Sequence, residues 1–226
     1  MILDTALSYQ PDEIVWLITW GTLKPSSRLD HPLIAQNPAE FYKLARRFDF
    51  LPGNYKSPDW ITQLTDRNRT LFRVLRYQLY SLINIATGLD QIPGPKEVLP
   101  VRLSGDLTFE GMHPPKLDPG SVSIDQIQDF YQLAHDTPVW LINEPMLVLS
   151  GIPNSDVRYN VFYPRWIYDQ YRQYVHAAAA QNHWNYLDLW NMFPPGYYTD
   201  TPFHLNPDGE AKLAKVIAAA LVKGCP

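Results

Sequence analysis

The chain has 226 residues, a formal net charge of −4 and a hydrophobic fraction of 46%, which suits one α/β domain with a packed core and excludes a disordered polar chain. No block of Lys and Arg stands out, so nucleic acid is not expected as a partner. Cys225 is the only cysteine. A disulfide framework or a cysteine-based metal site within one chain is therefore excluded.

The N-terminus carries no recognisable secretory signal, and no apolar run is long enough to cross a bilayer. Residues 2–10 are predicted to form a short helix that begins without a capping residue. We therefore expect the natural N-terminus to lie further upstream, which leaves an extracytoplasmic location open.

The first strong element is the continuous apolar, β-branched run 14–20, which predicts a strand buried on both faces. It ends at Gly21, at the edge of the sheet where open α/β proteins place their ligands. The loop-rich segment 24–123 is predicted as an insertion.

Within this insertion the sequence predicts helices at 39–47 and 66–87. One face of the second helix carries Arg69, Arg73 and Arg76. A solvated face, a lid and a contact with an anionic membrane surface are the three interpretations left open for it.

Helices and strands alternate in the second half of the chain. The pattern predicts helices at 123–134, 163–180 and 210–222, and strands at 139–142 and 185–190. This order implies a parallel sheet with right-handed crossovers, and hence the α/β class.

An acid and an imidazole, Asp200 and His204, lie four residues apart in a proline-containing loop before the last helix. A histidine accepts a proton near neutral pH, and a carboxylate beside it fixes its tautomer and stabilises the imidazolium. The pair therefore predicts a general base. A helix-entry turn with a capping Asp and an unrelated His is the alternative.

The stretch from Tyr198 to Gly209, Y-T-D-T-P-F-H-L-N-P-D-G, resembles the last block of the SGNH (GDSL-type) hydrolases, in the branch of polysaccharide and cell-wall O-acetyl transferases and esterases. Residues 9–21 resemble the third block. The resemblance implies a three-layer α/β/α sandwich with a short parallel sheet, and a Ser-His-Asp site that hydrolyses or transfers O-acetyl esters of carbohydrate without metal or cofactor. The family block has two residues between Asp and His, whereas this chain has three.

The same resemblance places oxyanion-binding groups at the strand ends. Gly21 fits the third block, although Leu23 stands where that block has Asn. Asn143 and Glu144 follow the strand 139–142; Asn143 is predicted to donate to an oxyanion and Glu144 to bind a sugar hydroxyl. A structural turn before Pro145 is the alternative for both.

The family's nucleophile is a Ser in a Gly-Asp-Ser block that precedes the third block, and this chain has no such block. The nucleophile therefore remains unidentified: it lies upstream, on a partner polypeptide, or is missing from a non-catalytic binding or assembly protein. Without the family's first strand, the edge of strand 14–20 would be unpaired. We expect a homodimer, a partner chain, a domain swap or a rearranged N-terminus to cover it.

Asn143-Glu144-Pro145 also resembles the signature of barrel glycosidases, in which the Glu is the general acid. About 80 residues follow, too few for the second half of a barrel of about 250 residues, so this stays a minor alternative. The remaining histidines show no spacing typical of a metal site, and no metal is expected; they are His31, His113, His135, His176 and His183.

Overall fold

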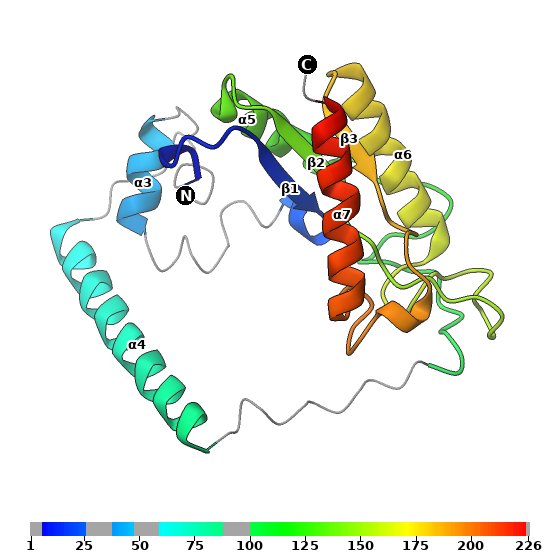
Figure 1. Ribbon diagram of the computed structural model, residues 1–226, viewed down its shortest axis with the longest axis horizontal. Coiled ribbons are helices and arrows are strands. Elements are labelled where there is room, and N and C mark those ends of the chain that lie inside the picture. Colours follow the sequence, from blue (N-terminus) through cyan, green and yellow to red (C-terminus); the bar gives the residue numbers. More distant parts are fainter. Residues whose placement is uncertain (1–5, 26–37, 48–58, 88–99, 225–226) are drawn as a thin grey trace. The chain divides into compact units, whose positions relative to one another are not determined.

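The computed structural model describes residues 6–25, 38–47, 59–87 and 100–224 (Figure 1). The chain divides into two compact units, each described here by itself. Unit 1 comprises residues 1–12, 24–93 and 125–137, and unit 2 comprises residues 13–23, 94–124 and 138–226. None of the helices within the described ranges is long and apolar enough to cross a membrane.

Unit 1 is helical in its described part. It contains α3 (Pro38–Arg47), α4 (Trp60–Thr87) and nearly all of α5 (Ile124–Ala134). All three were predicted, but α4 begins six residues before the predicted 66, because the apolar spacing continues through Ile61 and Leu64. The predicted start of the N-terminal helix, residues 2–5, lies outside the described residues.

Unit 2 contains a three-stranded parallel sheet in the order β1-β2-β3. The strands are β1 (Ile14–Ile18), β2 (Val139–Asn143) and β3 (Asn185–Asp188). Their register places Ile18, Asn143 and Asp188 side by side. The predicted α/β class and parallel sheet are confirmed, and all three carboxyl ends meet at one edge.

β1 is shorter than the predicted strand 14–20 because Thr22 folds back onto Thr19. The Thr22 hydroxyl donates to the Thr19 carbonyl over 2.8 Å, and the Thr22 amide donates to the same carbonyl over 3.2 Å. The short helix η1 (Gly21–Leu23) follows this turn. Val15 and Leu17 are 38% and 41% exposed, which differs from the predicted burial on both faces.

The helix α6 (Arg165–Gln181) connects β2 to β3. Its buried side chains repeat at helical spacing: Ile167, Tyr168, Tyr171, Val175 and Ala179. The Tyr168 hydroxyl lies 3.3 Å from the Asn143 amide. α6 therefore packs on the sheet face to which Asn143 belongs.

The final helix α7 (Pro207–Gly224) begins three residues before the predicted 210. Its start is set by Asn206, whose side-chain oxygen accepts a hydrogen bond from the Gly209 amide over 2.9 Å. Proline is favoured in the first helical position that follows such a cap, because its missing N–H is not needed there.

An apolar cluster lies beneath the loops that precede α7. It consists of Leu103, Leu147, Leu149, Phe193 and Tyr198, with Leu205 and Leu213 packed against it. The sequence predicts an ordered loop or a small hairpin for residues 89–123, of which 89–99 lie outside the described residues. Residues 100–123 contain one isolated bridge between Phe109 and Met112 and the short helix η4 (Pro119–Ser121). The cluster and the short helix η5 (Pro195–Tyr197) support the loop that carries Asp200 and His204.

Candidate functional site

Asp200 and His204 form a hydrogen-bonded pair. His204 Nδ1 lies 2.9 Å from Asp200 Oδ1, and the two side chains are 65% and 58% exposed. Asp200 Oδ1 also accepts a hydrogen bond from the Thr199 hydroxyl over 2.9 Å. The hydrogen bond with His204, followed by that from Thr199, holds the pKa of the Asp200 carboxyl below its usual value. Asp200 is therefore an ionised acceptor at neutral pH.

The loop turns back on itself, which brings Asp200 and His204 together. Tyr198 and Leu205 form an antiparallel bridge, and the Thr199 amide donates to the His204 carbonyl over 2.9 Å. Inside the turn, the Thr201 hydroxyl accepts from the His204 amide over 3.1 Å. Three residues separate Asp200 from His204, one more than in the family block, and this spacing still allows the two side chains to contact each other.

Backbone hydrogen bonds connect this loop to the end of β2. The Leu147 amide donates to the Pro202 carbonyl over 2.7 Å, and the Met146 amide donates to the Trp190 carbonyl over 2.9 Å. The Asp200–His204 pair therefore belongs to the carboxyl edge of the sheet, where ligands bind in open α/β folds.

Glu144 lies at the same edge, directly after β2. Its backbone amide donates to the Ile18 carbonyl over 3.1 Å, and its half-buried carboxylate has no hydrogen-bond partner among the described residues. Burial raises the pKa of Glu144 to about 7, an effect that the charge of nearby His204 opposes. Glu144 thus exchanges a proton close to neutral pH, beside the imidazole.

Two tyrosines stand close to the Glu144 carboxylate. Burial raises the pKa of Tyr163 and of Tyr198 well above the ordinary value, and the charge of Glu144 adds to the effect in both. The Tyr198 hydroxyl is buried and has no hydrogen-bond partner in the described part of the chain. The structure therefore brings together His204, Asp200 and Glu144 of the predicted site residues, with Tyr198 as an addition.

Asn143 has different surroundings from Glu144, because neighbouring residues on a strand point to opposite faces. It is 1% exposed, and its side-chain amide donates to Asp188 Oδ1 over 2.8 Å and to the Tyr168 hydroxyl over 3.3 Å. The amide that was predicted to bind an oxyanion is thus occupied by two protein acceptors.

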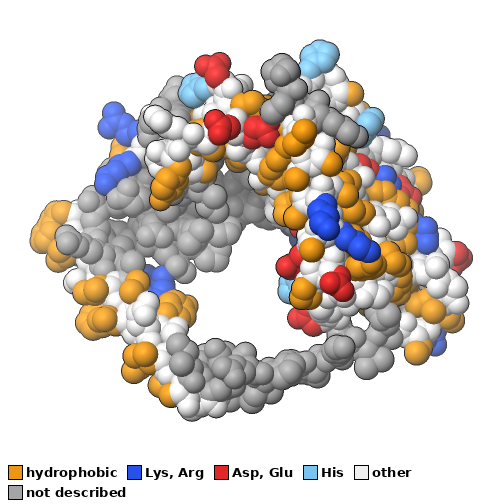
Figure 2. Space-filling model, in the orientation of Figure 1, with side chains coloured by type: hydrophobic (Ala, Val, Ile, Leu, Met, Phe, Trp, Pro, Cys, Tyr) orange, Lys and Arg blue, Asp and Glu red, His pale blue; other side chains and the backbone are white. Residues whose placement is uncertain are grey.

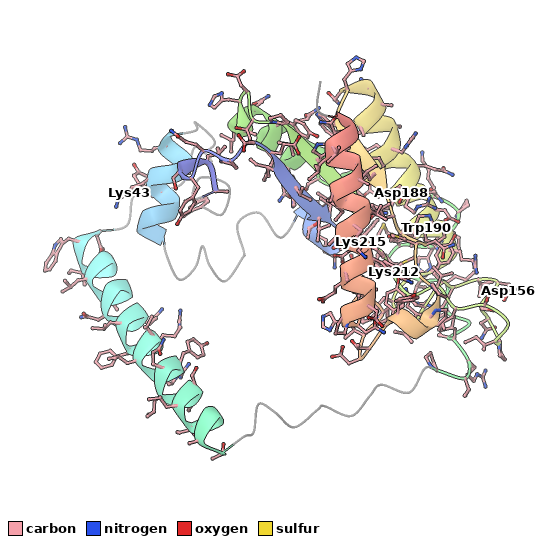
Figure 3. The ribbon with its side chains drawn as sticks, in the orientation of Figure 1. Lys43, Asp156, Asp188, Trp190, Lys212 and Lys215 are labelled. Carbon is pink, nitrogen blue, oxygen red and sulfur yellow. The ribbon has the colours of Figure 1, made fainter. Side chains whose placement is uncertain are left out.

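The partners of Asn143 form a network that sequence reasoning missed. Asp188 accepts from Arg172 Nη2 over 2.6 Å, and the Arg172 guanidinium lies 4.1 Å from the Trp190 ring centre. Figure 3 places Asp188 and Trp190 beside α6. The one indication of this network in the sequence is an acidic residue, Asp188, at the carboxyl end of the third strand.

Gly21 is the first residue of η1, three residues after the end of β1, and is exposed. A Cβ added there would meet Thr19 Oγ1 at 3.5 Å, an ordinary contact, so the local packing does not require glycine. Within the described ranges, no hydrogen bond joins Gly21 to the Asp200–His204 pair.

The nucleophile remains unidentified. Ser104 Oγ accepts from the Asp106 amide over 3.1 Å, and the Ser155 hydroxyl donates to the Ile152 carbonyl over 2.7 Å. Ser26 and Ser27 lie outside the described residues. His204 Nε2 has no hydrogen-bond partner in the ranges that the structure describes, so this nitrogen is open to a substrate or a hydroxyl group.

The loop between β2 and α6 is rich in Tyr and Asn, a composition that suits carbohydrate binding, and Arg158 lies in it while Arg165 and Trp166 follow at the start of α6. The structure uses these side chains to hold the loop instead. Arg158 donates to the carbonyls of Asp106 and Phe162 over 2.6 and 2.9 Å. Arg165 Nε donates to a carbonyl over 2.8 Å, and so does Trp166 Nε1. Their polar groups therefore bind backbone.

A small surface hollow, open to solvent, lies on one side of Asp200. Leu147, Leu149, Tyr198 and Pro202 are among the residues that line it. Among the described residues, no three His, Cys, Asp or Glu side chains are grouped to hold a metal ion. Comparison with protein-family models, curated proteins and solved structures finds no match to this chain.

Proposed function

We propose that the protein belongs to the SGNH-type serine hydrolases and that it hydrolyses or transfers acyl esters, with O-acetyl groups on carbohydrate as the substrate class. One observation carries the proposal. His204 Nδ1 lies 2.9 Å from Asp200 Oδ1 at the carboxyl edge of a parallel sheet, and Nε2 has no partner in the described part of the chain.

The geometry suits general base catalysis. Asp200 accepts the Nδ1 proton, which leaves Nε2 as the basic nitrogen of the imidazole. Nε2 would take the proton of an attacking hydroxyl group as its oxygen bonds to the acyl carbon. It would then return that proton to the leaving alcohol when the ester bond breaks.

The arrangement of the sheet supports the same proposal. We also propose that the fold is a three-layer α/β/α sandwich, with α6 on one face of the sheet and α7 on the other. The hollow beside Asp200 has apolar walls from Leu147 and Leu149 and would receive the acyl group.

A fluorophosphonate probe tests the proposal, because it reacts readily with the activated serine hydroxyl of serine hydrolases. Peptide mass spectrometry then identifies the labelled residue. We expect one labelled Ser, and we expect His204→Ala and Asp200→Asn to lose the label together with hydrolysis of p-nitrophenyl acetate. His113→Ala is the matched control, since His113 lies outside the loop that carries the pair.

Two outcomes would contradict the proposal. Equal labelling of the wild type and His204→Ala would remove His204 from the reaction. Absence of labelling in the folded chain, with no ester hydrolysis, would mean that this polypeptide alone is not a serine hydrolase. The nucleophile would then have to come from an upstream segment or a partner chain, or the protein would be a non-catalytic binding or assembly protein.

A glycosidase is the second candidate, and one specific observation favours it. The pKa of about 7 for Glu144 suits a general acid at neutral pH. Hydrolysis of a nitrophenyl glycoside that Glu144→Gln abolishes and His204→Ala retains would establish this second candidate and refute the first.

A further inference from the structure

The helix α4 presents two exposed faces of different chemistry. Leu64, Leu71, Leu75, Leu79 and Leu82 follow one another at spacings of seven, four, four and three residues, which places them on one side of the helix. Each of the five is more than half exposed. Figure 2 shows hydrophobic side chains along α4, and Figure 3 shows its side chains projecting on both sides.

The other face carries arginine. Arg69, Arg73 and Arg76 are spaced by four and three residues, so they lie on one side of the helix. Four arginines and one aspartate give residues 60–87 a formal charge of +3, so the rest of the chain, at −4 in total, carries −7. α4 thus carries a net positive charge beside an exposed apolar face, whereas the rest of the chain is net negative.

We propose that α4 is a membrane-surface helix, which lies on a bilayer of anionic phospholipid with its leucine face in the acyl boundary and its arginines among the headgroups. Charge complementarity selects this occupant. A second copy packed on the leucine face would cover the leucines but would offer no anionic surface to the arginines on the other face. An anionic bilayer accepts both the leucines and the arginines.

Other features of α4 agree with a helix that lies in the interface. Trp60 and Tyr77 are 73% and 56% exposed, and such amphipathic rings favour the headgroup level of a bilayer. α4 is not apolar enough to span a membrane, since arginine repeats along one face. The inference is independent of the proposed ester chemistry.

Co-sedimentation of the full chain with lipid vesicles tests this inference. The vesicles contain phosphatidylcholine alone or phosphatidylcholine mixed with phosphatidylserine. We expect binding to the mixed vesicles that weakens with added salt. One arginine near an anionic surface contributes about fivefold in binding, so Arg69→Gln, Arg73→Gln and Arg76→Gln together should weaken it on the order of 100-fold.

A second variant removes apolar surface and keeps the charge: Phe72→Ser with Leu75→Ser should also abolish binding. Arg102→Gln and Val222→Ser are the matched controls, because they change an exposed arginine and an exposed apolar side chain elsewhere. Both should bind like the wild type. Circular dichroism confirms that each variant keeps its helix content.

Three results would overturn the inference. The first is equal binding to both kinds of vesicle, or none to either. The second is a dimer in the absence of lipid that Phe72→Ser with Leu75→Ser dissociates, which would assign the leucine face to a second copy. The third is that the wild type binds no vesicles and that Phe72→Ser with Leu75→Ser lowers the melting temperature. This result would mean that the leucine face of α4 is buried inside the protein.

Discussion

Replacement of Glu144 by glutamine should stabilise unit 2 at pH 8 and have little effect at pH 5. Burial raises the pKa of this carboxyl from 4.5 to about 7, so the folded chain binds the proton more tightly than the unfolded chain. The protonated form therefore contributes stability that is complete below pH 4.5 and is lost as the pH rises through 7. The amide of the substituted side chain cannot ionise, so the variant escapes this loss.

The magnitude follows from the pKa. A change of one in pKa corresponds to about 1.4 kcal/mol, so a rise from 4.5 to about 7 gives about 3.4 kcal/mol if the carboxylate is fully shielded from water. Glu144 is half-buried, and partial solvation reduces the difference to about 2 kcal/mol. For a chain of this length that is about 4–8 °C in melting temperature.

Tryptophan fluorescence during thermal or urea unfolding measures the effect, because every tryptophan except Trp60 belongs to unit 2. Asp156→Asn is the control: it removes an exposed carboxylate, drawn at the outer side of the loops in Figure 3, and should change neither curve. In His204→Ala the loss of wild-type stability should move to higher pH, because the positive charge that lowers the Glu144 pKa is gone. A Glu144→Gln variant with the same shift at both pH values, or with lower stability at pH 8, would refute the reasoning.

Three further predictions concern the framework of the site. Asp188→Leu should destabilise unit 2 by about 2–3 kcal/mol in urea unfolding, because Asn143 and Arg172 both lose their carboxylate acceptor; a change under about 0.5 kcal/mol would contradict this value. Asn206→Ala should cost about 1 kcal/mol in the same assay through loss of the α7 cap, and Asn206→Asp should retain it; equal losses would argue against capping. Among the ways to cover the edge of β1, we propose a second copy of the chain, so light scattering should give more than the monomer mass; a monomer at every concentration would exclude a homodimer.

The sheet was predictable because its strands are short apolar runs between turn residues. Ile14–Ile18 and Val139–Asn143 each lie within or next to a predicted strand, and the alternation with helices allows only a parallel arrangement. The ends were harder to predict, because they depend on single side chains such as Thr22 in the turn after β1 and Asn206 at the start of α7.

The site was predictable only where its residues are close in sequence. Asp200 and His204 share one loop, and their spacing indicated contact. Asn143 and Asp188 are 45 residues apart, and their pairing depends on the register of β2 and β3, which a sequence pattern does not specify. Composition was also misleading for Arg158, whose guanidinium binds backbone carbonyls within the loops.

The hydrogen bond from the Leu147 amide to the Pro202 carbonyl has a consequence for engineering. It joins two backbone groups, so the side chain of either residue can change without loss of the bond. Both residues also line the hollow beside Asp200. For the proposed hydrolase, Leu147→Val or Leu147→Met should therefore change the acyl preference while the hydrogen bond to the Pro202 carbonyl is retained.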